Sequence, residues 1–101
     1  NCSSAGLTIG PWSRDFAALD NAGVLLRIDG RLVQAGSTAA ILGHPLRSLV
    51  QASQLLSRAN IALPAGSLVM AGAATAAEAL HPGAHVSVEI AGLGESRFTC
   101  V

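Results

Sequence analysis

Residues 43–75, which open with GHPLRSLVQASQLLSRA at 43–59, are the stretch around which we expect the rest of the chain to be arranged. Pro45 suits the first turn of a helix, because its nitrogen needs no hydrogen-bond partner there and its φ angle is already helical. Large apolar side chains then recur at the spacing of one helix face, at Leu46, Leu49, Val50 and Leu56. The sequence therefore predicts an amphipathic helix over residues 45–59.

The same stretch predicts where the helix ends and what it buries. Asn60 readily takes the left-handed conformation that ends a helix, and Pro64 prevents the helix from resuming. Because Leu49 and Val50 lie centrally on the apolar stripe, we expect both to be core residues.

Strand patterns flank this helix on both sides. Residues 23–28 are rich in Val, Leu and Ile, and the Asp29-Gly30 pair that follows is a preferred two-residue hairpin turn, so residues 31–34 should return antiparallel. After the helix, residues 67–71 predict a strand of mostly small residues. Residues 73–80 could form a short helix or a loop, and we expect a loop.

The last part of the chain predicts a second hairpin. Residues 84–90 alternate, with Val86, Val88 and Ile90 on one face and the polar residues between them on the other. Residues 92–95 form the turn and residues 96–101 the returning strand. The pattern predicts an α+β fold, mostly β, in which a twisted antiparallel sheet or β roll packs around one main helix. At 101 residues the chain should form a single domain, 1–101.

Composition excludes several classes of protein. Six arginines balance six acidic residues with no lysine, so the chain offers no electrostatic footprint for nucleic acid or an anionic membrane. No apolar run is long enough to span a bilayer, and we expect a cytoplasmic protein.

The two cysteines, Cys2 and Cys100, are expected to be free thiols. Only three residues are aromatic, so the core is built from small aliphatic side chains, and we expect a partner surface to support it.

A set of short motifs in fixed order resembles a known family. Asn-x-Ser-Ser-x-Gly occupies residues 1–6, Leu19-Asp20 precedes the first hairpin, and Gly-His-Pro-Leu opens the helix. Leu-x-Ala-Gly, Ala-Gly-Ala-x-Thr and Gly-Leu-Gly follow at residues 63–66, 71–75 and 92–94. The chain resembles, over essentially its whole length, the C-terminal part of the 2-oxopent-4-enoate hydratase and 4-oxalocrotonate decarboxylase family. That family belongs to the fumarylacetoacetate hydrolase superfamily.

The resemblance implies metal-assisted lyase chemistry on short unsaturated 2-oxo acids from aromatic-ring breakdown. In the full-length family, Mg or Mn chelates the substrate's carboxylate and 2-oxo oxygens and stabilises the enolate. Its ligands include a Glu-x-Glu pair upstream of the Asn-x-Ser-Ser motif, and this chain has no such pair. A hard cation needs several oxygen ligands, so no cofactor is expected in this chain by itself.

The resemblance also selects candidate site residues. Ser3 and Ser4 match the motif beside the substrate, where two hydroxyls could bind a carboxylate or position water; the alternative is an ordinary chain terminus. Gly72 and Thr75 match the segment that approaches the substrate carboxylate, and a missing Cβ at Gly72 would permit close backbone contact. The alternative for these two is a small-residue core strand.

The histidines are further candidates. His44 has an ionisable ring suited to acid or base catalysis, but it precedes a helix, where a capping role is commoner. His81 and His85 flank a turn, where their spacing does not direct both rings at one metal ion.

Two classes of function remain open. The chain is either a lyase of the hydratase or decarboxylase type, acting on a small 2-oxo acid, or a truncated, non-catalytic β scaffold that self-associates. In both cases we expect a homo-oligomer, most simply a dimer, whose interface uses the strands at residues 24–28 and 86–90.

Overall fold

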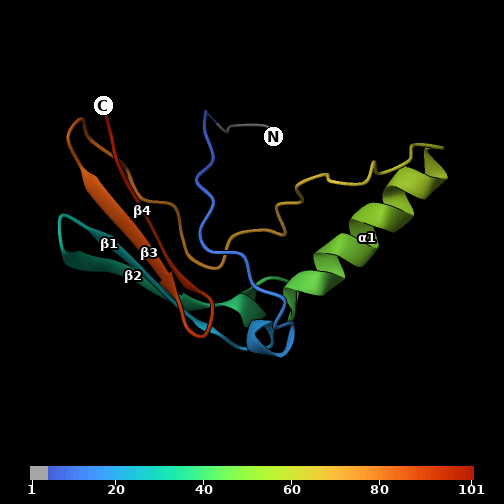
Figure 1. Ribbon diagram of the computed structural model, residues 1–101, viewed down its shortest axis with the longest axis horizontal. Helices are drawn as coiled ribbons and strands as arrows, with labels where there is room; N and C mark the ends of the chain where they lie inside the picture. Colours follow the sequence, from blue (N-terminus) through green and yellow to red (C-terminus); the bar gives the residue numbers. More distant parts are fainter. Residues whose placement is uncertain (1–4) are drawn as a thin grey trace.

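The computed structural model describes residues 5–101 and contains one antiparallel sheet and one long helix (Figure 1). The strands are β1 (Gly23–Ile28), β2 (Arg31–Ser37), β3 (His85–Ile90) and β4 (Gly94–Thr99). They lie in the order β2-β1-β3-β4, and all three neighbouring pairs are antiparallel. The long helix is α1 (Pro45–Arg58), and two short 3-10 helices, η1 (Ala17–Leu19) and η2 (Thr38–Ala40), lie before β1 and after β2. The predicted fold class, α+β and mostly β, is confirmed.

The β1–β2 hairpin turns at the predicted residues. Asp29 and Gly30 both have positive φ angles, 51° and 80°, as a two-residue turn compatible with strand twist requires. The backbone N–H of Asp29 also donates to the carbonyl of His85, at 2.8 Å, which ties the turn to the start of β3. β2 runs to Ser37, three residues beyond the predicted end at Gln34, and a bulge interrupts its register at Leu26/Arg27.

The two faces of the sheet differ in polarity. The β1–β3 register pairs Leu26 with Val88 and Ile28 with Val86, so apolar side chains gather on one face. Arg27 pairs with Ser87 on the opposite face. The predicted alternation of β3 is confirmed, and the buried core is small: Ala22, Val24, Ala84 and Val86.

A buried threonine joins the sheet to the segments that lead away from it. The Thr38 hydroxyl accepts from the backbone N–H of Ala22 at 2.8 Å and donates to the carbonyl of Leu19 at 2.7 Å. The backbone N–H of Thr38 donates to the carbonyl of Ala22 at 2.9 Å. These bonds fix the end of β2 against the chain that enters β1, at the base of α1.

α1 begins and ends close to the predicted residues. His44 is its N-cap, and Pro45 occupies the first turn. At the other end, Asn60 has φ 55°, the N–H of Asn60 donates to Ser57, and the N–H of Ile61 donates to Leu56. This pair of bonds around a left-handed residue is the Schellman arrangement.

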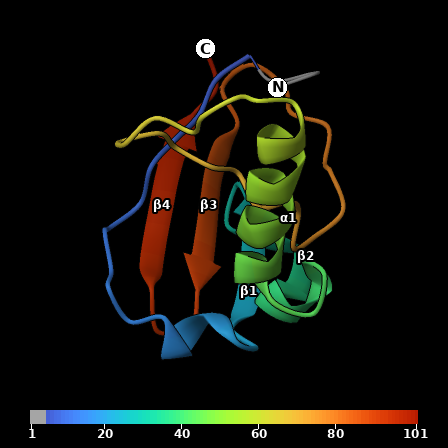
Figure 2. The same ribbon diagram turned by 90° about the vertical axis from the view of Figure 1, so that its right-hand side faces the viewer.

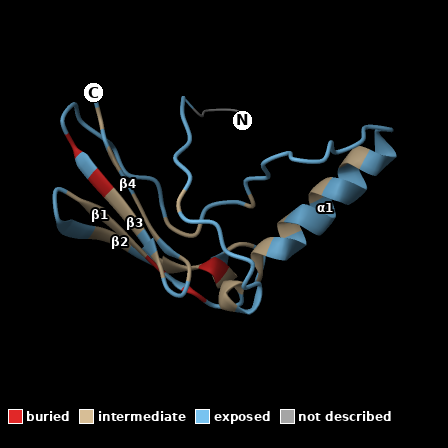
Figure 3. Cartoon of the chain, viewed as in Figure 1, coloured by how far each residue is buried: buried red, intermediate tan, exposed pale blue. Residues whose placement is uncertain are grey.

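α1 does not pack on the sheet as expected. The helix and the sheet form two arms that diverge from the Thr38 region, with extended segments of the chain between them (Figures 1 and 2). Leu49 is 38% exposed and Val50 is 55% exposed, so the prediction that both are core residues is wrong for this structure. Figure 3 shows no buried residue along α1. The apolar stripe correctly predicted a helix with a face to bury, but the described residues do not supply the surface that buries it.

The predicted strand at residues 67–71 is also wrong. These residues belong to a long connection between α1 and β3 that forms no helix or strand. Residues 73–80 form no element either, so the predicted loop is confirmed. β4 begins at Gly94, two residues before the prediction. In residues 5–101 no helix is both long and apolar enough to cross a membrane.

Because α1 is exposed, truncating an apolar side chain should cost less stability on α1 than in the sheet. Leu49→Ala should lower the free energy of unfolding of the 101-residue chain by less than about 1 kcal/mol, because Leu49 loses little buried area. Val24→Ala, at a buried position of β1, should cost about 2 kcal/mol. Urea unfolding of both variants measures the difference. A larger loss for Leu49→Ala than for Val24→Ala would show that α1 is covered in solution.

Candidate functional site

Thr75 lies against the edge strand β2, where a glycine makes room for it. A Cβ built on Gly36 would stand 2.1 Å from the carbonyl oxygen of Ala74 and 3.0 Å from the Thr75 methyl group. No side chain fits at that distance, so the glycine lets the connection between α1 and β3 lie directly on the strand. Thr75 itself is half-buried.

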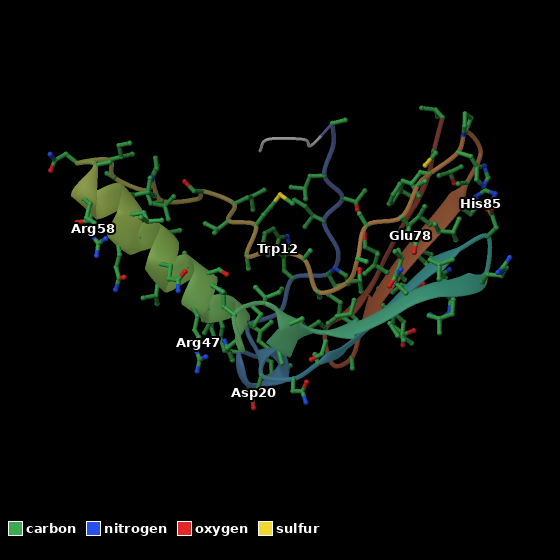
Figure 4. The ribbon with its side chains drawn as sticks, turned by 180° about the vertical axis from the view of Figure 1, so that it is seen from behind. Trp12, Asp20, Arg47, Arg58, Glu78 and His85 are labelled. Atoms are coloured by element: carbon green, nitrogen blue, oxygen red, sulfur yellow. The ribbon has the colours of Figure 1, made fainter. Side chains whose placement is uncertain are left out.

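A side-chain hydrogen bond also ties the same connection to β2. The amide of Gln34, two residues before Gly36 in β2, donates to the carboxylate of Glu78. Figure 4 shows Glu78 beside the sheet. Gln34, Gly36, Thr75 and Glu78 therefore form one candidate site along β2, which we call the β2 site.

Gly72 lies next to the β2 site and has a conformation that favours glycine. Its φ angle is 140°, and a Cβ there would approach the Ile41 side chain to 3.2 Å. Gly72 is exposed, so its backbone is accessible to a ligand. The structure thus places Gly72 and Thr75 on one short stretch, with Gly72 against Ile41 and Thr75 against β2 at Gly36.

His44 is used as a helix cap. Its Nδ1 atom accepts from the backbone N–H of Leu46 at 3.1 Å, which satisfies one of the free donors at the start of α1. This is the capping role that the sequence offered as the alternative to catalysis. Because Nδ1 accepts a bond, the neutral ring carries its proton on Nε2.

Ser3 and Ser4 lie outside the described residues. Their suggested roles beside a substrate therefore stay predictions.

A second cluster joins the β1–β2 turn to the start of β3. The Asp29 carboxylate accepts from the backbone N–H of His85 at 2.9 Å and lies 3.1 Å from Nε2 of His81. The other ring nitrogen of His81 lies 3.0 Å from the carbonyl of Pro82. Both partners of His81 are acceptors, so both bonds form only when the ring is protonated.

Charge and hydrogen bonding in this cluster shift two pKa values. The bond to the Pro82 carbonyl, followed by that to Asp29, raises the pKa of His81 above its ordinary 6.5. The bond from the His85 backbone, followed by that from His81, lowers the pKa of Asp29 below its ordinary 3.8. His85 itself turns its Nδ1 to the Thr99 hydroxyl of β4, at 2.9 Å.

The face of the sheet that carries Arg27 forms a wide concavity of about 670 Å³. Arg27 pairs with Glu89 at 3.1 Å, and Arg97 forms two bonds with Glu95, at 2.8 and 2.7 Å. The Arg97 guanidinium lowers the pKa of Glu95, and Glu95 raises that of Arg97. Since each arginine already has a carboxylate partner, this face carries paired charges and no evident ligand-binding group.

A divalent metal does not fit the described residues alone. Within residues 5–101, no group of three or more His, Cys, Asp or Glu side chains is placed to hold an ion. The carboxylate nearest Thr75 in the β2 site, Glu78, is bonded to Gln34. We therefore derive no metal-dependent step from these residues.

The sheet, the single helix and the β2 site define the class of protein. The fold is that of the fumarylacetoacetate hydrolase-like enzymes, as likeness to a solved structure shows. The 4-oxalocrotonate decarboxylase from Pseudomonas putida G7, complexed with calcium and acetate, superposes with a TM-score of 0.78 at 36% identity, over 83% of this chain and 32% of that one. A second structure of that enzyme, complexed with magnesium and adipate, matches to the same extent.

The sequence comparisons give the family. The model described as fumarylacetoacetate (FAA) hydrolase C-terminal matches residues 1–101, and the chain belongs to this family. A 4-oxalocrotonate decarboxylase of Pseudomonas sp. is 46% identical over 98% of this chain and 39% of its own length. The 2-keto-4-pentenoate hydratase of Paraburkholderia xenovorans (strain LB400) is 34% identical over 96% of this chain and 37% of its own length. The chain thus spans about two-fifths of these relatives, and the resemblance predicted from the motifs is confirmed.

Three residues of the β2 site were missed by the sequence reasoning: Gln34, Gly36 and Glu78. Gly36 carried a usable signal, because a glycine inside a strand often marks a close approach of another backbone. Gln34 and Glu78 are separated by 44 positions, and no local pattern connects them. Asp29 and His81 were also missed as partners, for the same reason.

The close approach at Gly36 predicts a steric effect of one methyl group. Gly36→Ala should lower the free energy of unfolding by about 1–3 kcal/mol, because the connection at Ala74 must move away from β2. Gly23→Ala is the matched control, since a Cβ at Gly23 meets no atom within 4 Å. Urea unfolding gives the two values. Equal values for both variants would show that residues 74–75 do not rest on β2.

The His81 cluster predicts a pH dependence with a defined sign. Because the folded-state pKa of His81 is raised, the protonated ring stabilises the fold fully below pH 6.5, and this contribution is lost as the pH rises through the higher folded value. An NMR titration should give His81 a pKa above 6.5. Asp29→Asn, which tolerates the same left-handed turn, should lower that pKa. An unchanged His81 titration in the variant would contradict the pairing.

Proposed function

We propose that this chain is the C-terminal part of a lyase, a hydratase or decarboxylase, that acts on short unsaturated 2-oxo acids. The observation that carries this proposal is the β2 site, in which the Thr75 segment is fixed against a strand in a member of the fumarylacetoacetate hydrolase family. Relatives named as decarboxylase and hydratase support both reaction types. We further propose that residues 1–101 act as one domain, that the whole protein is cytoplasmic, and that its substrates come from aromatic-ring breakdown.

We assign roles to the site residues on the same basis. The accessible backbone at Gly72 and the hydroxyl of Thr75 bind the substrate carboxylate. Gln34 and Glu78 hold the segment in place, since their bond ties it to β2. Ser3 and Ser4 position water or a second carboxylate. For His44, proton transfer would have to use Nε2, because its Nδ1 caps α1.

A divalent metal ion would supply part of the chemistry in the whole enzyme. The solved relative is complexed with calcium or magnesium, and Mg or Mn would polarise the 2-oxo group and stabilise an enolate when bound. Its ligands would come from the part of the protein that this chain does not match. The chain's own residues bind and orient the carboxylate end of the substrate.

A second candidate function rests on a different observation. Many large apolar residues are exposed, among them Trp12, Leu55 and Met70, and exposed patches of this kind favour association. A non-catalytic scaffold that forms a homo-oligomer, a dimer or higher, would cover them. An activity measurement distinguishes the two candidate functions, because only the lyase needs Thr75.

The activity test uses a chimera in which the upstream part of the 46%-identical Pseudomonas relative precedes residues 1–101. With Mg²⁺ present, the chimera should consume 2-hydroxypenta-2,4-dienoate or 4-oxalocrotonate. Thr75→Val should lower kcat/KM at least about 10-fold, the equivalent of one lost hydrogen bond of 1.4 kcal/mol.

Thr99→Val, at an exposed position of β4, is the matched control and should leave kcat/KM unchanged. Full activity of the Thr75→Val chimera would remove Thr75 from the site. A folded chimera with no activity on either substrate would favour the scaffold.

A further inference from the structure

The connection between α1 and β3 meets the first hairpin at three places. The contacts are residues 74–75 on Gly36, Glu78 on Gln34, and His81 on the Asp29 carboxylate at 3.1 Å. As the connection goes forward from residue 74 to residue 81, its contacts go back along β2 from residue 36 to the turn at residue 29. One short run of chain therefore carries Thr75 near its start and His81 at its end.

Side chains decide where this run lies. Among residues 5–101, no backbone–backbone hydrogen bond involves residues 72–80. The next backbone bond along the chain runs from the N–H of Ala84 to the carbonyl of His81, at 3.1 Å. The Thr75 segment is consequently placed by its contacts with the hairpin, and a change at any of them reaches it.

Asp29 is a rigid acceptor for His81. Its φ angle of 51° belongs to the two-residue turn, and its own backbone N–H donates to the carbonyl of His85 at 2.8 Å. One carboxylate oxygen, Oδ1, accepts from the backbone N–H of His85 at 2.9 Å, and the other, Oδ2, faces His81. Because the backbone of β3 fixes this carboxylate, the pair ties His81 to the sheet and not to a freely moving side chain.

The proton on His81 decides whether the pair holds. The two ring nitrogens lie against two acceptors, the Asp29 carboxylate and the Pro82 carbonyl, so only the protonated ring bonds to both. The bond to Pro82, followed by that to Asp29, raises the pKa of His81 above 6.5. Loss of the proton removes one of the two bonds and the attraction to Asp29.

His85 and Cys100 are the other titratable residues on the elements around this pair. The pKa of Asp29 is lowered most by the His85 backbone bond, then by His81, and least by the charge of the His85 ring. Cys100 meets this region through its backbone, which bonds to residues 83–84 at 2.9 Å. His81 is thus the titratable side chain that links the connection to the turn.

We propose that Asp29 and His81 are positioning residues for the substrate at the β2 site. Their charged pair holds the far end of the connection against the hairpin and thereby keeps the Thr75 segment in its binding position. When the pair opens, the substrate must order this segment as it binds, and that cost falls on binding rather than on chemistry. KM should therefore rise while kcat stays constant. This inference rests on the proposed function, since it concerns the carboxylate-binding role of Gly72 and Thr75.

Kinetics of the chimera with the upstream part of the 46%-identical Pseudomonas relative test the proposal. KM and kcat for 4-oxalocrotonate with Mg²⁺ are measured across the titration of His81, with and without His81→Gln. At low pH the substitution should raise KM about 3-fold, because both partners are exposed and such pairs are weak. The ratio of the variant's KM to the wild-type KM should fall to one as the pH rises through the His81 pKa. A ratio that does not change with pH, or a change in kcat alone, would overturn the proposal.

His85→Gln is the matched control. It removes the neighbouring imidazole and leaves the Asp29–His81 pair in place, so its KM should equal the wild-type KM at every pH. A rise in KM equal to that of His81→Gln would overturn the assignment to His81.

Asp29→Asn tests the partner. Asparagine tolerates the left-handed turn and can still accept from the His85 backbone N–H, but it carries no charge. The variant should lower the His81 pKa, measured by NMR, and raise KM at low pH as His81→Gln does. Both substitutions together should raise KM no further than either alone, because both break one pair. Additive effects on KM would overturn the proposal.

The Thr75 methyl group reports the position of the segment without catalysis. It lies 3.0 Å from the place of a Cβ on Gly36, so its NMR shift should follow the His81 titration in the 101-residue chain and lose that dependence in His81→Gln. A Thr75 signal that ignores the titration would overturn the proposal. An inactive chimera whose Thr75 signal still follows His81 would support the positioning and count against the proposed function, so the two failures are distinguishable.

Discussion

The pairing of β1 with β3 is the constraint on which the rest of the structure depends. It joins residues such as Arg27 and Glu89, 62 positions apart in the chain, and it places the two hairpins in one sheet. Closing so long a loop costs conformational entropy, which the apolar pairs Leu26–Val88 and Ile28–Val86 offset by burying surface. The chain between the two hairpins, which includes α1 and the connection after it, leaves the sheet after β2 and returns to it at β3.

This segment between β2 and β3 is attached to the sheet at a few points. Thr38 fixes its start, because a single buried hydroxyl bonds to both Ala22 and Leu19. Gly36 and Gln34 hold its later part, where Ala74, Thr75 and Glu78 lie on β2. The Asp29 carboxylate holds its end by bonding the His85 backbone. The candidate site forms at the second of these attachments, on an ordered strand with an accessible segment laid across it, which suits a binding site on a rigid support.

Between these attachments the chain is poorly buried. Among residues 5–101, four small apolar residues are buried, and large apolar side chains on α1 and on residues 61–70 are exposed. Figure 3 shows no buried colour along either segment. A chain with so little buried area has a small margin of stability.

The sequence by itself determined the elements that depend on local chemistry. Asp29-Gly30 made the hairpin because both residues tolerate positive φ, Pro45 and Asn60 set the ends of α1, and the alternation of β3 set its two faces. The ordered motifs also gave the family. Only the tertiary structure decided where those elements lie. It left Leu49 and Val50 exposed, left residues 67–71 without a strand partner, and brought Glu78 to Gln34. An apolar stripe or an extended segment specifies that a face must be covered, while its neighbour is chosen by contacts between residues far apart in the chain, which no local pattern encodes.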